Sequence, residues 1–171
     1  MTNRDILVEK YFWENELSGL DLPILLKDNI RADRAFISLF NSYFSKKNET
    51  KKTVLEVGCN PGKFLIYFKK YLNYNISGFD YDEVGCEITK ENIKIAGVSG
   101  FIKQTDILNF EPKEKFDVVL SCGFIEHFVG DALEKVMDVH IKLLKKNGKL
   151  FISIPNFRYV NYTIAYLLRR N

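Results

Sequence analysis

The chain has 171 residues, of which 46% are hydrophobic and 27% are charged, and its formal net charge is +3. This length and apolar content predict one globular domain with an ample core, and the small net charge gives no strong indication of nucleic-acid binding. The three cysteines form no CxxC pair, which argues against a disulfide framework and a zinc site. No apolar run reaches the roughly 20 residues that a membrane span needs. With no apolar signal core in the first residues, these features favour the cytoplasm.

Residues 1–50 precede the first predicted strand and have a mostly helical pattern. The clearest segment is 31–46, where a wide apolar stripe contains Ala32, Ala35, Phe36, Leu39, Phe40, Tyr43 and Phe44. We expect residues 1–50 to form an N-terminal helical cap on the sheet, with a lid over a bound ligand as a second role. Residues 51–171 are then expected to form the main domain.

A β-branched run at 53–57 predicts a buried strand, which stops at a glycine-rich turn before a helical pattern at 64–72. Such strand-turn-helix units bind nucleotides. The turn does not fit a P-loop, because three residues separate Gly58 from Gly62 and Phe64 follows Lys63. It does not fit a dinucleotide fingerprint either, because Asn60 replaces a glycine and the Glu56 carboxylate would repel a pyrophosphate. A nucleoside ligand that carries positive charge suits these residues better.

The stretch Glu56-x-Gly58-Cys59-x-Pro61-Gly62-x-Phe64 resembles the first motif of the class I S-adenosylmethionine (SAM)-dependent methyltransferases. In that family the acidic residue and the glycine turn hold the methionine end of the cofactor. The resemblance therefore implies SAM as the cofactor and S-adenosylhomocysteine (SAH) as the product. It assigns the first part of the cofactor site to Glu56, Gly58, Cys59, Asn60 and Gly62.

Two further acidic landmarks follow in the order that this family has. A strand at 75–80 ends at Asp80, where an acidic group can accept both ribose hydroxyls, and Tyr81 comes next. Asp82 is expected to cap a helix at 82–97. A strand at 101–105 leads to Asp106 and Ile107, which match the adenine-binding positions of the family, although an aspartate that only starts a loop is an equal reading.

The fourth predicted strand covers 116–121 and leads into a loop that contains Glu126 and His127. Ser121 and Cys122, at the end of this strand, complete the expected cofactor site. We expect a helix from an N-cap at Asp131 to Asn147-Gly148, a fifth strand at 149–154, and helical spacing in 156–171.

This alternation predicts an α/β fold, a doubly wound and mostly parallel sheet of order 3-2-1-4-5 with helices on both faces. The resemblance covers about residues 53–160. Family members usually continue with a final antiparallel strand pair, which this chain lacks. A truncated chain, a minimal domain and a homodimer whose second copy covers the sheet edge all fit that difference.

His127 is the candidate catalytic residue, because imidazole takes up protons near neutral pH and the loop after strand four faces the transferred methyl group. A hydrogen bond to backbone or a cofactor contact is the other role considered for it. Some relatives bind a metal through Glu-x-x-Glu-His, but Gly123 replaces the first glutamate, so we expect no metal.

These features predict methyl transfer to an oxygen or nitrogen of a small-molecule acceptor. A SAM- or SAH-binding module without catalysis is the alternative, and a nicotinamide dehydrogenase is a third hypothesis. Cys59 and Cys122 are expected to be packing residues, because no base is evidently paired with either thiol.

Overall fold

The computed structural model describes residues 21–44 and 51–156. The first helix of the described residues is α2 (Arg31–Tyr43), and mainly alternating strands and helices follow it. They are β1 (Thr53–Val57), α3 (Lys63–Leu72), β2 (Asn75–Asp80), α4 (Glu83–Ile95), β3 (Phe101–Gln104), the 3₁₀ turn η1 (Ile107–Asn109), β4 (Phe116–Cys122), the 3₁₀ turn η2 (Ile125–His127), α5 (Gly130–Lys142) and β5 (Leu144–Ser153).

The five strands form one sheet of order β3-β2-β1-β4-β5, and all of its pairings are parallel. The chain therefore leaves β1 in one direction, reaches β3, and then returns across the sheet to β4 and β5. The carboxyl ends of β1 and β4 lie side by side where this direction reverses, and such a point in an open α/β sheet is where ligands bind. The predicted fold class and strand order are confirmed.

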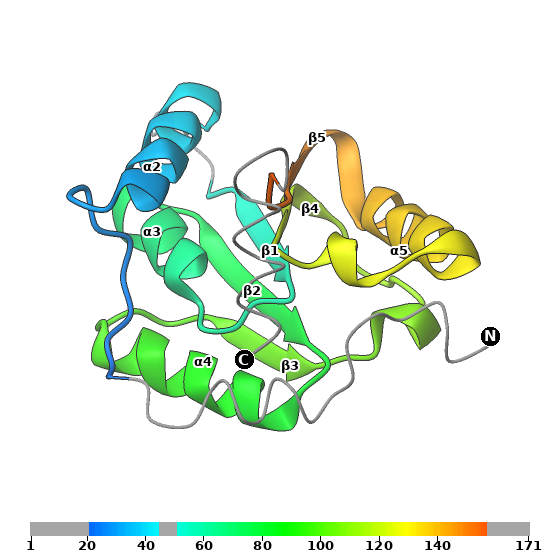
Figure 1. Cartoon of the computed structure of the whole chain (residues 1–171), viewed down its shortest axis with the longest axis horizontal. Helices are drawn as coiled ribbons and strands as arrows, with labels where there is room; N and C mark the ends of the chain where they lie inside the picture. The colour runs from blue at the N-terminus through cyan, green and yellow to red at the C-terminus, as the bar shows by residue number, and fades with distance from the viewer. Residues whose placement is uncertain (1–20, 45–50, 157–171) are drawn as a thin grey trace, which may run out of the picture.

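Each face of the sheet has its own hydrophobic core, since buried parallel strands are apolar on both sides. Helices α2, α3 and α4 cover one face, and α5 with η1 covers the other (Figure 1). In β1, Val54 packs into the first core and Leu55 into the second, as the alternation of side chains along a strand requires. Helix α2 joins the first core through Phe40, whose ring packs against Phe68 and Phe151 at centroid distances of 5.0 and 5.2 Å.

Local sequence signals explain the boundaries of α3 and the start of α4. The Asp82 carboxylate accepts a hydrogen bond of 2.8 Å from the backbone N–H of Gly85, which confirms the predicted cap of α4. Helix α3 is preceded by Gly62 at φ +84° and followed by Asn73 at φ +60°, two left-handed positions. Glycine adopts that conformation without a Cβ clash, and asparagine tolerates it better than most residues.

The boundary between α5 and β5 differs from the prediction. Helix α5 starts at Gly130, and Asp131 is in its first turn instead of being the N-cap. The helix ends at Lys142, and β5 already begins at Leu144, because Leu144 pairs with Phe116 of β4. The register then shifts before Val118 pairs with Lys149. Asn147-Gly148, which was expected to end the helix, is instead part of an irregularity inside β5.

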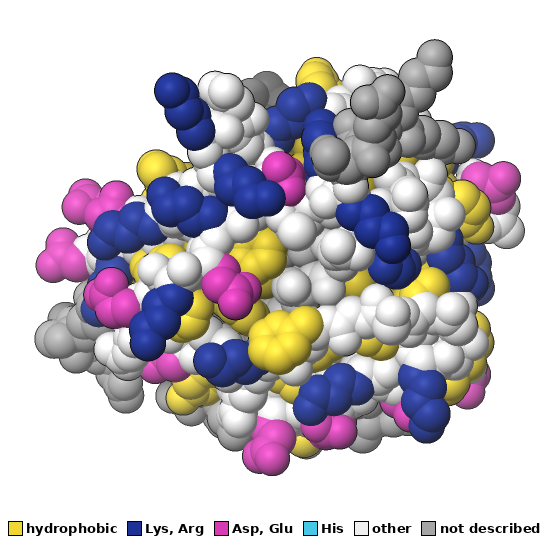
Figure 2. Space-filling view, turned by 180° about the vertical axis from the view of Figure 1, so that it is seen from behind, with side chains coloured by type: hydrophobic (Ala, Val, Ile, Leu, Met, Phe, Trp, Pro, Cys, Tyr) yellow, Lys and Arg dark blue, Asp and Glu magenta, His cyan; other side chains and the backbone are white. Residues whose placement is uncertain are grey.

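No helix in the described ranges is long and apolar enough to cross a membrane. Figure 2 shows the face opposite to that of Figure 1, where lysine and arginine side chains are interspersed with acidic ones. The helical pattern expected for 157–171, and that of residues 1–20, lie outside the described residues.

Candidate functional site

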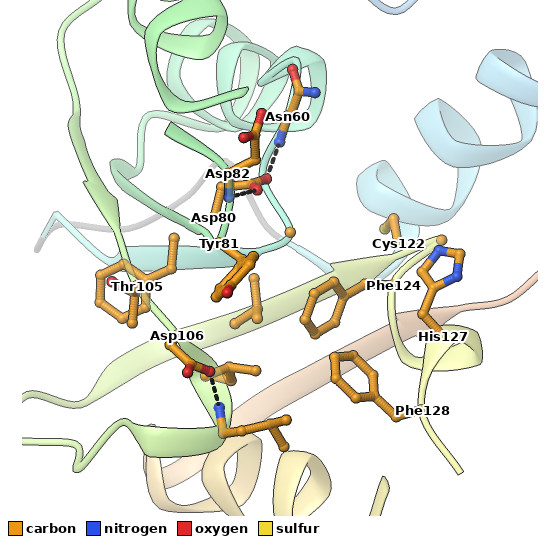
Figure 3. A pocket seen from close by; sticks show the side chains of 16 residues that line it. Asn60, Asp80, Tyr81, Asp82, Thr105, Asp106, Cys122, Phe124, His127 and Phe128 are labelled. Carbon is orange, nitrogen blue, oxygen red and sulfur yellow. Dashed lines mark hydrogen bonds between the residues drawn. The ribbon is translucent and has the colours of Figure 1, made fainter. Parts of the chain in front are cut away.

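A cavity of about 230 Å³ opens at the carboxyl ends of the first four strands (Figure 3). Eight of the predicted site residues line it, namely Gly58, Asn60, Asp80, Tyr81, Asp106, Ile107, Cys122 and His127. The topology brings them together, because they follow four strands that are neighbours in the sheet. The other lining residues are Val57, Phe79, Asp82, Thr105, Leu108, Gly123, Phe124 and Phe128, and the sequence analysis did not assign them to the site.

Glu56 does not line this cavity but is buried at the end of β1, with 2% of its surface exposed. Burial raises the pKa of its carboxyl well above the ordinary value of 4.5, and nearby Asp80 raises it further. The Lys63 ammonium and a hydrogen bond from the backbone N–H of Leu65 act in the opposite direction. The Oε2 atom has no hydrogen-bond partner among the described residues. A positively charged ligand group at that oxygen would satisfy it and offset the burial of the charge.

Asp80 is at the end of β2 and directs its carboxylate toward the turn after β1. Its Oδ2 accepts from the backbone N–H of Asn60 at 3.2 Å, and its Oδ1 accepts from the backbone N–H of Asp82 at 3.0 Å. Burial raises the pKa of Asp80, and these two hydrogen bonds oppose that shift. Each oxygen still has a lone pair for a ligand hydroxyl, because an ionised carboxylate offers about four acceptor sites.

Asp106 occupies the corresponding place after β3. Its Oδ1 accepts from the backbone N–H of Leu108 at 3.0 Å, and its Oδ2 accepts from the Asn109 side chain at 2.7 Å. Asp106 therefore caps η1, and it also lines the cavity beside the buried side chain of Ile107. The two readings of Asp106 from the sequence are compatible, since capping leaves acceptor capacity on both oxygens.

The loop after β4 forms the aromatic side of the cavity. Phe124 and Phe128 pack with their ring centroids 5.1 Å apart, and His127 lies between them in the chain (Figure 3). The Phe124 ring covers the glycine turn: a Cβ at Gly58 would lie 2.6 Å from its Cδ2 atom. Gly58 is therefore required both by its φ of +72° and by this close approach.

Three predicted site residues lie behind the cavity wall. Cys59 is fully buried, and a Cβ at Gly78 would lie 2.7 Å from its sulfur atom. A Cβ at Gly62 would lie 2.8 Å from the Cγ2 atom of Thr89 on α4. Ser121 is buried, and its hydroxyl has no hydrogen-bond partner among the described residues.

The cysteine thiols are poor nucleophiles in this structure. Burial raises the pKa of Cys59 and of Cys122, and it raises the pKa of Cys86 to about 11. These thiols stay protonated near neutral pH. The second histidine, His140, is buried in α5 with its Nδ1 atom 2.7 Å from the carbonyl oxygen of Val136, and burial lowers its pKa. Within the described ranges, no group of three or more His, Cys, Asp or Glu residues could hold a metal ion.

A doubly wound sheet of order 3-2-1-4-5, with an acidic cavity at its carboxyl edge, is the architecture of the class I Rossmann-like SAM-dependent methyltransferases. Residues 30–169 match the model of the family described as a methyltransferase domain, and the chain belongs to this family. The cofactor of this class of enzymes is SAM.

Individual relatives differ in what they are named for. The chain is 33% identical over 100 residues to ribosomal protein L11 methyltransferase of Caldicellulosiruptor bescii, covering 58% of this chain and 31% of that protein. It is 29% identical over 140 residues to ubiquinone biosynthesis O-methyltransferase of Pelagibacter ubique, covering 82% of this chain and 55% of that protein. The solved structure of PKMT2 from Rickettsia typhi with AdoHcy superimposes with a TM-score of 0.56 and 25% identity, covering 71% of this chain and 25% of that one. The chain therefore spans about a third to a half of these curated relatives.

Proposed function

We propose that this chain transfers the methyl group of SAM to an oxygen or nitrogen atom of a small-molecule acceptor. The observation that carries the proposal is a set of three carboxylates near the carboxyl ends of three neighbouring strands. Asp80 and Asp106 line the cavity, and Glu56 is buried near the end of β1. Glu56 retains a buried oxygen without a partner. An anionic edge of this kind suits a cationic nucleoside and disfavours a pyrophosphate.

The cofactor roles follow the order of the strands. Glu56, with the turn from Gly58 to Gly62, is assigned to the methionine end, and Asp80 with Tyr81 is assigned to the ribose. Asp106 and Ile107 are assigned to the adenine, with the carboxylate accepting from the amino group and the apolar side chain packing on the ring. Ser121 and Cys122 support the cofactor from the end of β4. In this assignment residues 51–171 hold the site and residues 1–50 form the cap.

The chemistry needed from the protein is mainly positioning. Bound SAM supplies a methyl group that is already activated and leaves behind a neutral thioether. The cavity walls must hold the acceptor atom in line with that group, and alignment of this kind is worth roughly 7–11 kcal/mol. His127, on the opposite side of the cavity from Asp80, is assigned as the base that takes the acceptor proton on a ring nitrogen (Figure 3).

The aromatic side of the cavity supports a small and partly apolar acceptor. Phe124 and Phe128 present rings beside His127, and ring faces of this kind bind flat apolar molecules. The P. ubique relative named for ubiquinone biosynthesis aligns with more of this chain than the relative named for ribosomal protein L11. A protein side chain is the second candidate acceptor, because relatives named for L11 also match.

Two measurements test the proposal. Titration calorimetry should show binding of SAH and SAM and no binding of NAD; binding of NAD with indifference to SAH would contradict the proposal. Incubation with methyl-labelled SAM and a panel of phenols, amines and L11-derived peptides should then show transfer to a small-molecule oxygen or nitrogen. Binding without transfer to any acceptor would favour the non-catalytic SAM- or SAH-binding module, and transfer to the peptides alone would favour a protein acceptor.

A further inference from the structure

A partly buried ion pair connects α2 to the first residue of α3. The Lys63 ammonium lies 3.0 Å from Oδ1 of Asp33, and Asp33 is only 5% exposed. The other oxygen, Oδ2, accepts a hydrogen bond of 3.1 Å from the backbone N–H of Lys27. Both oxygens of Asp33 are therefore engaged, and the Lys63 ammonium has a fixed position above the Phe64 ring at 5.1 Å from its centroid.

Lys63 is also a neighbour of Glu56. It is the first residue of α3, and the Glu56 carboxylate accepts the backbone N–H of Leu65 in the same helical turn. The charge of Lys63 lowers the pKa of Glu56, although burial and Asp80 outweigh it. Lys63 thus stands in electrostatic range of two buried carboxylates, one in the cap and one in the sheet.

The carboxylates of Asp33 and Glu56 differ in how many hydrogen-bond partners they have. Asp33 has a partner on each oxygen, whereas Oε2 of Glu56 has none. A lysine side chain is long and flexible, and a buried carboxylate strongly favours a nearby cation. Without the Asp33 carboxylate, we therefore expect the Lys63 ammonium to move toward the unpaired Oε2 atom of Glu56.

We propose that Asp33 is a positioning residue of the cofactor site. It holds the Lys63 ammonium away from Glu56, so that the buried Oε2 atom stays unpaired and can receive the ammonium of an amino-acid-bearing nucleoside. This inference rests on the proposed function, in which Glu56 receives the methionine end. It adds a contribution from α2, none of whose residues lines the cavity. The proposal also predicts specificity for the amino-acid end of the ligand. A nucleoside without an α-amino group cannot pair with the Oε2 atom of Glu56.

The test uses the whole chain and two ligands that differ in the amino-acid end. The Asp33→Asn variant should bind SAH about tenfold more weakly, because Lys63 then competes for Glu56. A tenfold change is close to the contribution of one hydrogen bond to a charged group. Its affinity for adenosine should not change. The double variant Asp33→Asn with Lys63→Met should recover SAH binding to within about threefold of the wild type at alkaline pH, because the competing ammonium is gone.

A matched control is Glu87→Gln, which removes the acidic partner of an exposed ion pair with Lys90 and should leave both affinities unchanged. Asp33→Ser replaces Asp33→Asn if that variant does not fold. Unchanged SAH affinity on loss of the Asp33 charge, equal weakening of SAH and adenosine, or no recovery in the double variant would each overturn the inference. A wild-type chain that binds adenosine but not SAH would instead overturn the proposed function.

Discussion

The backbone N–H of Asn60 donates a hydrogen bond of 3.2 Å to Oδ2 of Asp80, and this contact ties the turn after β1 to the end of β2. The other oxygen of Asp80 holds the chain as it leaves β2, through the backbone N–H of Asp82. The carboxylate that we assign to the ribose therefore also shapes the turn that we assign to the methionine end. In this assignment, the structural role of Asp80 and its role in ribose binding are coupled.

The Asp80→Asn variant tests this coupling. The asparagine amide would place an NH₂ group against one of the two backbone donors, so we expect the free energy of unfolding to fall by about 1–3 kcal/mol. SAH affinity should fall by at least about tenfold, because a hydrogen bond from a ribose hydroxyl to a charged acceptor is lost. Chemical denaturation and titration calorimetry measure the two effects. Asp131→Asn, at an exposed site in α5, is the control, and unchanged SAH affinity in Asp80→Asn would reject the ribose assignment.

A comparison of two glycines tests the contact between the Phe124 ring and the turn after β1. Gly58 and Gly97 both have a positive φ, of +72° and +69°, but a Cβ meets the Phe124 ring only at Gly58 and meets nothing within 4 Å at Gly97. Gly97→Ala should cost about 1 kcal/mol of stability from backbone strain alone. Gly58→Ala should cost about 1–3 kcal/mol more, because the ring must also move, and it should weaken SAH binding. An equal decrease of the denaturant midpoint in Gly58→Ala and Gly97→Ala would show that the Phe124 ring moves at no cost in stability.

The sequence was most informative where chemistry is local. Short strand-like runs at 53–57, 75–80 and 101–105 predicted three strands with an acidic residue near each carboxyl end. Parallel strands place these ends together, so the acidic edge was predictable as well. The start of β5 was missed, because Leu144 is held by pairing with Phe116, a contact distant in sequence. Phe124 was missed as a wall of the cavity, because the direction of a loop side chain depends on tertiary packing. The link from Asp33 to Lys63 likewise joins segments that no local pattern relates.

The Glu56→Gln variant should bind SAH more weakly than the wild type and be more stable at alkaline pH. Burial raises the pKa of Glu56 in the folded state, so as pH rises above the ordinary value of 4.5 the unfolded chain ionises first and folding stability is lost. Glutamine does not ionise and avoids this loss. The variant should therefore be more stable than the wild type at pH 8, with the difference narrowing as pH falls toward 4.5, and it should bind SAH poorly. Thermal unfolding across this pH range measures the effect, and a difference that does not change with pH would contradict it.

The side chain of Asn92 in α4 connects the segment before α2 to the turn after β1. Its side chain donates to the carbonyl oxygens of Ile24 and Pro61 at 2.9 and 2.7 Å, and it accepts the Ile24 N–H at 2.8 Å. Asn92→Asp would turn two attractive contacts into repulsions between oxygens at a fully buried site, so we expect a loss of about 3–5 kcal/mol. Asn75→Asp, at an exposed position, should have little effect. Hydrogen exchange at the Ile24 amide should accelerate in Asn92→Asp, and unaltered protection there would contradict the contact.

His127 is the residue whose removal should separate chemistry from binding. It lines the cavity beside the aromatic rings, away from the carboxylates assigned to the cofactor (Figure 3). If it takes the acceptor proton, His127→Ala should lower kcat by about 10²- to 10⁴-fold while SAH affinity changes by no more than about threefold. Added imidazole should restore part of the turnover, since a small base can then occupy the vacated space. A residue that only orders the loop would show no such rescue, and normal turnover in His127→Ala would rule out the role of base.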